Sequence, residues 1–100
     1  QVIRHVVAWK LASDDADERA SHAQRIVDEL DALVGVVPEI ASLSAGANSL
    51  DLPGTWDVVP IAASADEAAL DAYQVHPAHK KVAEFIGTVR SDRVAVDFTV

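Results

Sequence analysis

The sequence predicts an α+β fold: a ferredoxin-like two-layer sandwich with one antiparallel sheet, in the order strand, helix, strand, strand, broken helix, strand (βαββαβ). Runs of β-branched and aromatic residues lie at both ends of the chain, at 2–11 and 93–100. Between them lie two segments whose apolar residues recur at spacings of three and four. The 100 residues fit one domain, 1–100, with a single core that is adequate but not large.

The segment 2–11 is predicted to be an interior strand. It is rich in β-branched residues and contains no glycine or proline. Because side chains alternate along a strand, one face carries Ile3, His5, Val7, Trp9 and Leu11, and the other carries Val2, Arg4, Val6, Ala8 and Lys10. Both faces are largely apolar, which is typical of a strand that is covered on both sides.

The next segment is predicted to be an amphipathic helix. Acidic and hydroxyl residues at 13–18 suit the N-terminal end of a helix. Gly35 and Pro38 supply the stop signals. The expected buried stripe is Ala23, Ile26, Val27, Leu30, Leu33, Val34 and Val37.

Two more strands are expected at 39–46 and 55–63, joined by a turn-rich segment at 46–54. That segment is too long for a tight hairpin, so we interpret it as a surface loop able to act as a lid. Pro60 lacks a backbone donor and therefore indicates a sheet edge, a strand end or a bulge.

The second helical segment is predicted to start at a capping box, Ser64 followed by Glu67, and to break at Pro77. Proline disfavours the helical region for the residue before it, His76, and suits the first turn of a new helix. The apolar stripe then resumes with Val82, Phe85, Ile86 and Val89, and Arg90 falls on the solvent side. The closing strand, 93–100, alternates cleanly, which predicts one buried face.

Two helices can cover only one face of this sheet, whereas the first strand is apolar on both. A second copy of the chain is the simplest way to cover the other face of the sheet, because most soluble oligomers are closed homodimers. We therefore expect a homodimer that pairs its sheets face to face. Burial of a few hundred Å² of apolar surface per subunit would contribute on the order of 10 kcal/mol before association costs.

The amino-acid composition disfavours several classes of binding partner and several kinds of site. Sixteen acidic residues against eight basic ones give a net charge of −8, which disfavours nucleic acid and anionic membrane surfaces. The absence of cysteine excludes disulfides, zinc–thiolate sites and thiol catalysis. The sequence shows no stretch that resembles a membrane span or a leader peptide, so we expect a cytoplasmic protein.

Several short motifs together resemble the stress-responsive A/B barrel domain (Dabb) family across nearly the whole chain. They are Ile3-Arg4-His5-Val6-Val7, Pro38-Glu39-Ile40, Asp71-Ala72-Tyr73, His76-Pro77-Ala78-His79 and Val96-Asp97-Phe98. The resemblance implies an α+β barrel formed when two ferredoxin-like subunits join their sheets. This implied assembly agrees with the homodimer expected from the two-faced first strand.

The resemblance also implies candidate site residues. One plant member of the family is a polyketide cyclase that closes a ring by intramolecular aldol condensation, and its catalytic tyrosine and histidine correspond to Tyr73 and His79. Its pocket histidine on the first strand corresponds to His5. Its other pocket histidine, on the third strand, corresponds approximately to Asp57, which is a departure from that cyclase.

From the residues themselves, His79 is a candidate general base and Tyr73 a candidate phenol donor, brought together by the break at Pro77. His5 lies in an apolar strand and needs a partner, either in the core or in a pocket wall. We also place Trp9, Asp57 and Phe85 as candidate pocket walls, although the rings of Trp9 and Phe85 could instead fill the core, which is the favoured role for Trp9. His76 is expected at the helix break, and His22 in solvent.

A metal site is not expected, because His76 and His79 are three apart across a proline rather than an i, i+4 helical pair. No cofactor motif is present, and a nucleotide-dependent enzyme is not expected. Two functions stay open. The first is a small-molecule binding protein or cofactor-free enzyme of lyase or cyclase type, and the second is a non-catalytic, stress-associated structural dimer whose histidines only support the fold.

Overall fold

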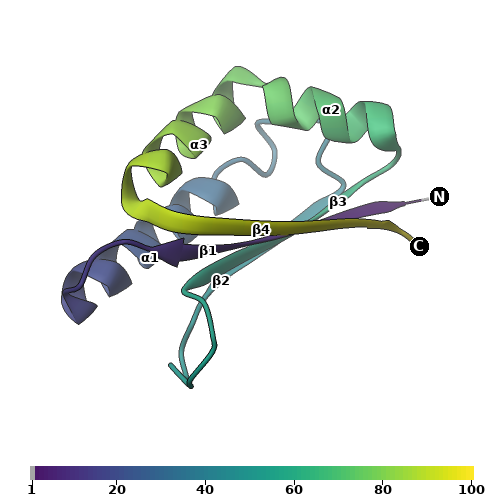
Figure 1. The fold of residues 1–100 in the computed structure, drawn as a ribbon. Coiled ribbons are helices and arrows are strands. Elements are labelled where there is room, and N and C mark those ends of the chain that lie inside the picture. The colour runs from purple at the N-terminus through teal and green to yellow at the C-terminus, as the bar shows by residue number, and fades with distance from the viewer. Residues whose placement is uncertain (1) are drawn as a thin grey trace.

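A computed structural model of the chain describes residues 2–100 and confirms the ferredoxin-like α+β fold (Figure 1). The strands form one antiparallel sheet in the order β2-β3-β1-β4. The elements in chain order are β1 (Ile3–Leu11), α1 (Ala16–Asp31), β2 (Ser42–Ala47), β3 (Val58–Ser64), α2 (Glu67–Val75), α3 (Pro77–Val89) and β4 (Arg90–Thr99).

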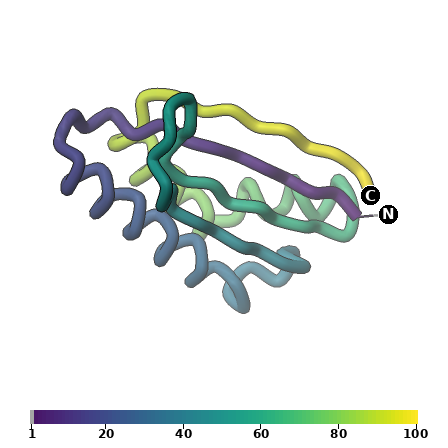
Figure 2. Tube along the Cα trace, turned by 90° about the horizontal axis from the view of Figure 1, so that it is seen from below, coloured from purple at the N-terminus to yellow at the C-terminus, as the bar shows by residue number. Residues whose placement is uncertain are grey.

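The helices cover one face of the sheet and leave the other bare. Figure 2, seen from below, shows the strands in front of the helices. β1 lies between β3 and β4, so the expectation of an interior strand is confirmed. Its residues His5, Val7, Trp9 and Leu11 are buried on the helix side. Val7, Trp9 and Leu11 belong to one core cluster with buried residues of the helices, such as Ile26, Leu30, Tyr73, Val82 and Ile86.

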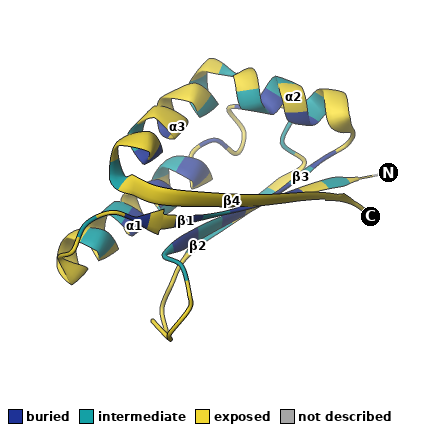
Figure 3. Cartoon of the chain, in the orientation of Figure 1, coloured by how far each residue is buried: buried dark blue, intermediate teal, exposed yellow. Residues whose placement is uncertain are grey.

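The bare face is largely apolar. Val94 and Val96 of β4 lie opposite Ala8 and Val6 of β1, and Phe98 lies opposite Arg4. All ten residues of β4 are exposed (Figure 3). The alternation along 93–100 therefore places its apolar side away from the helices, where no part of the described chain, residues 2–100, covers it.

The first helix is shorter than its apolar stripe. α1 ends at Asp31, and turns follow to Val36, with Gly35 at φ +87°. The turns still bury Leu33 and Val37, but they leave Val34 52% exposed. The apolar stripe predicted a helix longer than α1, because a series of turns can also bury every third or fourth residue.

Two local predictions near the third strand are wrong. Asp66, not Ser64, caps α2, because its carboxylate accepts a hydrogen bond from the Ala69 amide. Ser64 is instead the buried last residue of β3. A sheet edge, a strand end or a bulge was expected at Pro60, but Pro60 lies inside β3, which is an interior strand. The register of β1 with β3 is the same on either side of it, at Ile61 and at Val58.

None of the helices within residues 2–100 is long and apolar enough to span a membrane.

Candidate functional site

The break between α2 and α3 is built by His76 and Pro77. α2 ends at Val75, His76 is extended (φ −61°, ψ 134°), and Pro77 opens α3. The Nδ1 atom of His76 accepts a hydrogen bond from the Ala78 amide at 3.1 Å, so this side chain caps α3. The predicted kink is confirmed, and His76 is part of the break.

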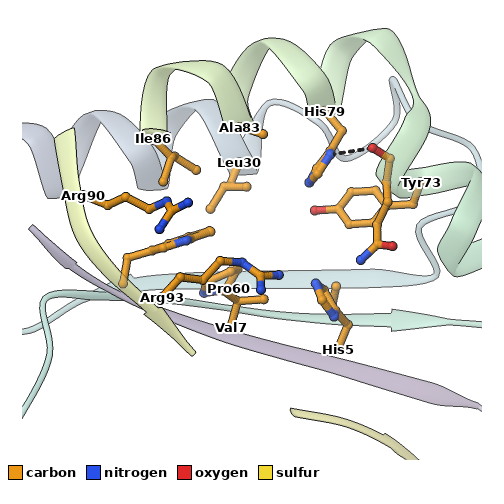
Figure 4. A pocket seen from close by; sticks show the side chains of 13 residues that line it. His5, Val7, Leu30, Pro60, Tyr73, His79, Ala83, Ile86, Arg90 and Arg93 are labelled. Atoms are coloured by element: carbon orange, nitrogen blue, oxygen red, sulfur yellow. Dashed lines mark hydrogen bonds between the residues drawn. The ribbon is translucent and has the colours of Figure 1, made fainter. Parts of the chain in front are cut away.

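The break brings Tyr73 and His79 together. Their ring centroids lie 4.5 Å apart with the planes tilted by 56°. Tyr73 is only 2% exposed, and His79 is partly buried. The Nδ1 atom of His79 lies 3.1 Å from the carbonyl oxygen of Gln74 (Figure 4). A carbonyl oxygen can only accept, so Nδ1 carries the hydrogen, and Nε2 of the neutral ring keeps a free lone pair.

The surroundings keep His79 neutral and Tyr73 protonated. Burial lowers the pKa of His79 below its ordinary 6.5; the positive charge of Arg93 acts in the same direction, and the hydrogen bond to Gln74 opposes both. Burial also raises the pKa of Tyr73 to about 12. The pair therefore offers one proton acceptor and one hydrogen-bond donor near neutral pH.

His5 enters the site from the sheet and is held by Asp97. The two residues are paired across β1 and β4, and Nδ1 of His5 is hydrogen-bonded to Oδ1 of Asp97. His5 is 6% exposed, so this carboxylate satisfies an otherwise buried imidazole. Because the carboxylate holds Nδ1, the ring orientation is fixed and Nε2 is left for other partners.

A cavity of about 200 Å³ joins these groups. His5, Tyr73 and His79 all line it, together with Trp9, which closes part of its apolar wall. Figure 4 shows His79 and Tyr73 on the helix side and His5 on the sheet side, facing the same space. The remaining apolar lining includes Val7, Leu30, Ala62 and Ile86.

Two residues expected in the pocket lie elsewhere. Asp57 precedes β3, where its Oδ2 accepts from the Leu11 amide at 2.7 Å and its Oδ1 lies 3.9 Å from Nε of Arg19. This carboxylate ties the end of β1 to the start of β3. Phe85 faces α1 instead, with the Arg25 guanidinium 3.6 Å from its ring centroid.

His22 is not solvated as expected. It lies edge-on to Phe85, with ring centroids 6.3 Å apart and planes at 84°. Its Nδ1 atom is buried without a hydrogen-bond partner within residues 2–100. The polar residues around it in the sequence did not reveal that α3 packs over this position.

Four residues of the site were not predicted from the sequence: Arg90, Arg93, Gln74 and Asp97. The first three line the cavity, and Asp97 holds His5. Arg93 and Asp97 share one side of the alternating strand 93–100, which is a signal that could have suggested them. Arg90 gave no such signal, because it continued the polar side of the preceding helix.

The loop between β2 and β3 is not a lid over this cavity. It projects from the sheet on the side opposite α2 and α3 (Figure 1), and none of its residues lines the cavity. Asn48 braces it through its side chain, which donates to the hydroxyl of Thr55 at 2.8 Å and accepts from the amide of Asp51 at 3.1 Å. Within residues 2–100, no group of three or more histidine, aspartate or glutamate side chains is arranged to hold a metal ion.

Comparison with known proteins gives a match over nearly the whole chain. A family model described as the stress responsive A/B barrel domain (Dabb) matches residues 3–100. A search of curated proteins gave no match.

Solved structures from several organisms share the fold. A dimeric protein of unknown function with a ferredoxin-like fold from Bacteroides fragilis is 22% identical, with 99% of this chain and 96% of that chain covered and a TM-score of 0.89. A dimeric ferredoxin-like protein of unknown function from Thermobifida fusca is 26% identical, with coverage of 99% and 91% and a TM-score of 0.84. A hydroxynitrile lyase from Passiflora edulis is 13% identical, with coverage of 100% and 94% and a TM-score of 0.79.

Proposed function

Because the chain belongs to the stress-responsive A/B barrel domain (Dabb) family, we propose that its cavity binds a small, largely apolar carbonyl compound and transfers a proton on it by cofactor-free acid–base chemistry. The observation that carries the proposal is the pairing of Tyr73 and His79, 4.5 Å apart, in a cavity that also exposes His5. An acceptor and a donor of protons thus face one largely apolar space.

The proposed step is removal of a proton from the carbon next to the carbonyl group. The free Nε2 of His79 takes this proton, the C–H bond breaks, and its electron pair moves through the new C=C bond onto the carbonyl oxygen. Tyr73, whose pKa of about 12 keeps it protonated, donates a hydrogen bond to that oxygen. Such a bond is worth more in a desolvated cavity than in water.

The enolate formed in this way has two outcomes. It can recover a proton from the His79 imidazolium, which gives exchange or isomerisation. Alternatively, its carbon attacks a second carbonyl group of the same compound, a C–C bond forms, and the imidazolium protonates the resulting alkoxide, as in an aldol ring closure. His5, oriented by Asp97, lies across the cavity and supplies a second polar contact to the guest.

The comparisons support this proposal at the level of the fold. The Passiflora edulis protein with this architecture is a hydroxynitrile lyase, so the architecture accommodates lyase chemistry. At 13% identity it supports no residue assignment, and the assignments above rest on the cavity of this chain.

We also propose that two copies pair through the bare face of the sheet. That face exposes Val94, Val96 and Phe98 by 48%, 59% and 42%. A contiguous apolar surface of this kind marks an interaction site. The similar proteins from Bacteroides fragilis and Thermobifida fusca are both described as dimeric, which supports a second copy as the partner.

The test of the acid–base proposal is proton exchange on a neutral ketone, methyl 4-oxo-4-phenylbutanoate, followed by NMR in D₂O. The wild-type protein should accelerate exchange at the carbon next to the ketone. His79→Gln should lower the rate by about 10²–10⁴-fold, and Tyr73→Phe should lower it as well. His22→Gln is the control, because His22 lies outside the cavity.

Equal exchange rates with and without the protein, for this ketone and for its free acid 4-oxo-4-phenylbutanoate, together with no binding of either compound, would refute the proposal. A large loss of stability in His79→Gln without any effect on the ketone would favour the alternative function, a structural dimer whose histidines only support the fold.

A further inference from the structure

We infer that the cavity recognises a carboxylate group through Arg90 and Arg93, so that its guest is a small oxo acid rather than a neutral ketone. This inference rests on the proposed function, which assigns the carbonyl group to the His79 and Tyr73 side of the cavity. It adds a second recognition site in the same space and defines the chemical class of the guest.

A β-bulge brings the two arginines to one face. Arg93 pairs with Trp9 and Asp92 with Lys10, but Leu11 pairs with Arg90, so β4 carries one extra residue, Ser91, at this point. In a regular strand, residues three apart lie on opposite faces. The extra residue brings Arg90 to the face that Arg93 occupies, and bulges frequently re-aim side chains next to binding sites.

The cavity is positively charged in a strongly acidic protein. The chain has a net charge of −8, yet the described residues that line the cavity include two cationic arginines and no aspartate or glutamate. Charged groups of one sign along a low-dielectric cleft concentrate the field there. The lining therefore favours an anionic guest over a neutral or cationic one.

Within residues 2–100, neither guanidinium has a hydrogen bond or an ion pair. The ion pairs within residues 2–100 use Arg19, Arg25 and His5, and the side chains of Arg90 and Arg93 have no hydrogen bond or salt bridge there. Both arginines are exposed, and Figure 4 shows their side chains directed into the cavity, with Arg93 on the sheet side. Ten N–H donors in two planar groups are thus free for a ligand.

A carboxylate fits these donors best. The planar fork of a guanidinium matches the two oxygens of a carboxylate. The cavity, about 200 Å³, is smaller than the ~300–1,000 Å³ of typical ligand pockets, so the guest is small. The apolar walls at Val7, Leu30 and Ile86 suit a hydrocarbon body between the carboxylate and the reacting carbonyl group.

The test compares 4-oxo-4-phenylbutanoate with its methyl ester, which lacks the negative charge and carries one additional methyl group. Binding is measured by titration calorimetry at low salt for the wild type, Arg90→Gln and Arg93→Gln. Lys81→Gln removes one positive charge from an exposed position of α3 outside the cavity and is the matched control.

We expect the acid to bind the wild type at least ten-fold more tightly than the ester. Each arginine variant should weaken binding of the acid about ten- to a hundred-fold and change that of the ester by less than about two-fold. Lys81→Gln should match the wild type for both compounds. The preference for the acid should also decline as salt is added.

Equal affinity of acid and ester in the wild type, or equal weakening of both in the arginine variants, would overturn the carboxylate assignment and leave the acid–base proposal standing. Failure of both compounds to bind the wild type would overturn both proposals together. Loss of fold in an arginine variant is detected by its circular dichroism spectrum. In that case the relative affinity of the wild type for acid and ester alone tests the carboxylate assignment.

Discussion

The rings of Tyr73 and His79 lie 4.5 Å apart, although the two residues belong to different helices separated by the break at Pro77. In one continuous α-helix, residues six apart point about 120° away from each other. The break therefore creates the pair, and it places both rings in the same partly desolvated space. The pKa of each ring therefore depends on how strongly that space is desolvated.

Tyr73 should lose its phenolic proton at a higher pH than an ordinary tyrosine does. Its folded pKa of about 12 exceeds the ordinary 10.0, so the folded state holds the phenolic proton more firmly. This contribution to the free energy of unfolding is fully present below pH 10 and is lost as the pH rises towards 12. Tyr73 is the one tyrosine of the chain, so tyrosinate absorbance reports it directly. A midpoint near 10 in the folded protein would contradict the burial of this ring.

His79 should lose its proton at a pH below 6.5, as followed by the NMR shift of its ring C–H. Because the unfolded chain binds this proton more readily, the free energy of unfolding falls as the pH drops from 6.5 through the folded-state pKa. The variant His79→Gln should show a weaker fall over that window. A ring that titrates above 6.5 would indicate that His79 is charged, and unsuited to act as a base, at neutral pH.

Asp97 should stabilise the fold through His5. Asp97→Ala leaves a buried imidazole N–H without its partner, so we expect the free energy of unfolding to fall by about 1–3 kcal/mol. Asp97→Asn keeps an acceptor and should cost less. Asp92→Ala is the control on the same strand, where an exposed carboxylate accepts a side-chain hydrogen bond only from Ser91 within residues 2–100, and it should change stability by less than about 0.5 kcal/mol. Equal effects at both positions in urea unfolding would argue against this role.

Val96 should lie in the interface between two copies. Val96→Asp places a charge on the bare face of the sheet and should convert the dimer to monomer in sedimentation or light scattering at micromolar concentration. Val36→Asp is the matched control, because Val36 is 57% exposed, against 59% for Val96, and lies in the turns after α1. A wild-type protein of monomer mass would contradict the dimer.

Local patterns predicted most of the fold. Alternation and spacings of three and four predicted strands and helices because most elements turn one side of a short segment toward the core; β4 alternates as well, although all ten of its residues are exposed. The break at Pro77 followed from the missing amide hydrogen and predicted that Tyr73 and His79 would share one space. These features depend on neighbouring residues alone, so they can be predicted from the sequence.

The local predictions failed where several short-range patterns compete. Ser64 and Asp66 both precede the helix that begins at Glu67. Ser64 is the last residue of β3, and Asp66 caps α2. The apolar stripe continued beyond Asp31 because turns buried Leu33 and Val37. A period of three or four does not distinguish a helix from a tight series of turns.

The sequence by itself determined the order of elements, the helix break and a tyrosine–histidine pair in one segment. Tertiary structure decided which distant groups join that pair: His5 and Asp97 meet across 92 positions, and a one-residue bulge places Arg90 beside Arg93. It also moved Asp57 and Phe85 out of the cavity. The physical reason is that strand register and the packing of helix on sheet are set by hydrogen bonds and contacts between remote segments, which no local pattern encodes.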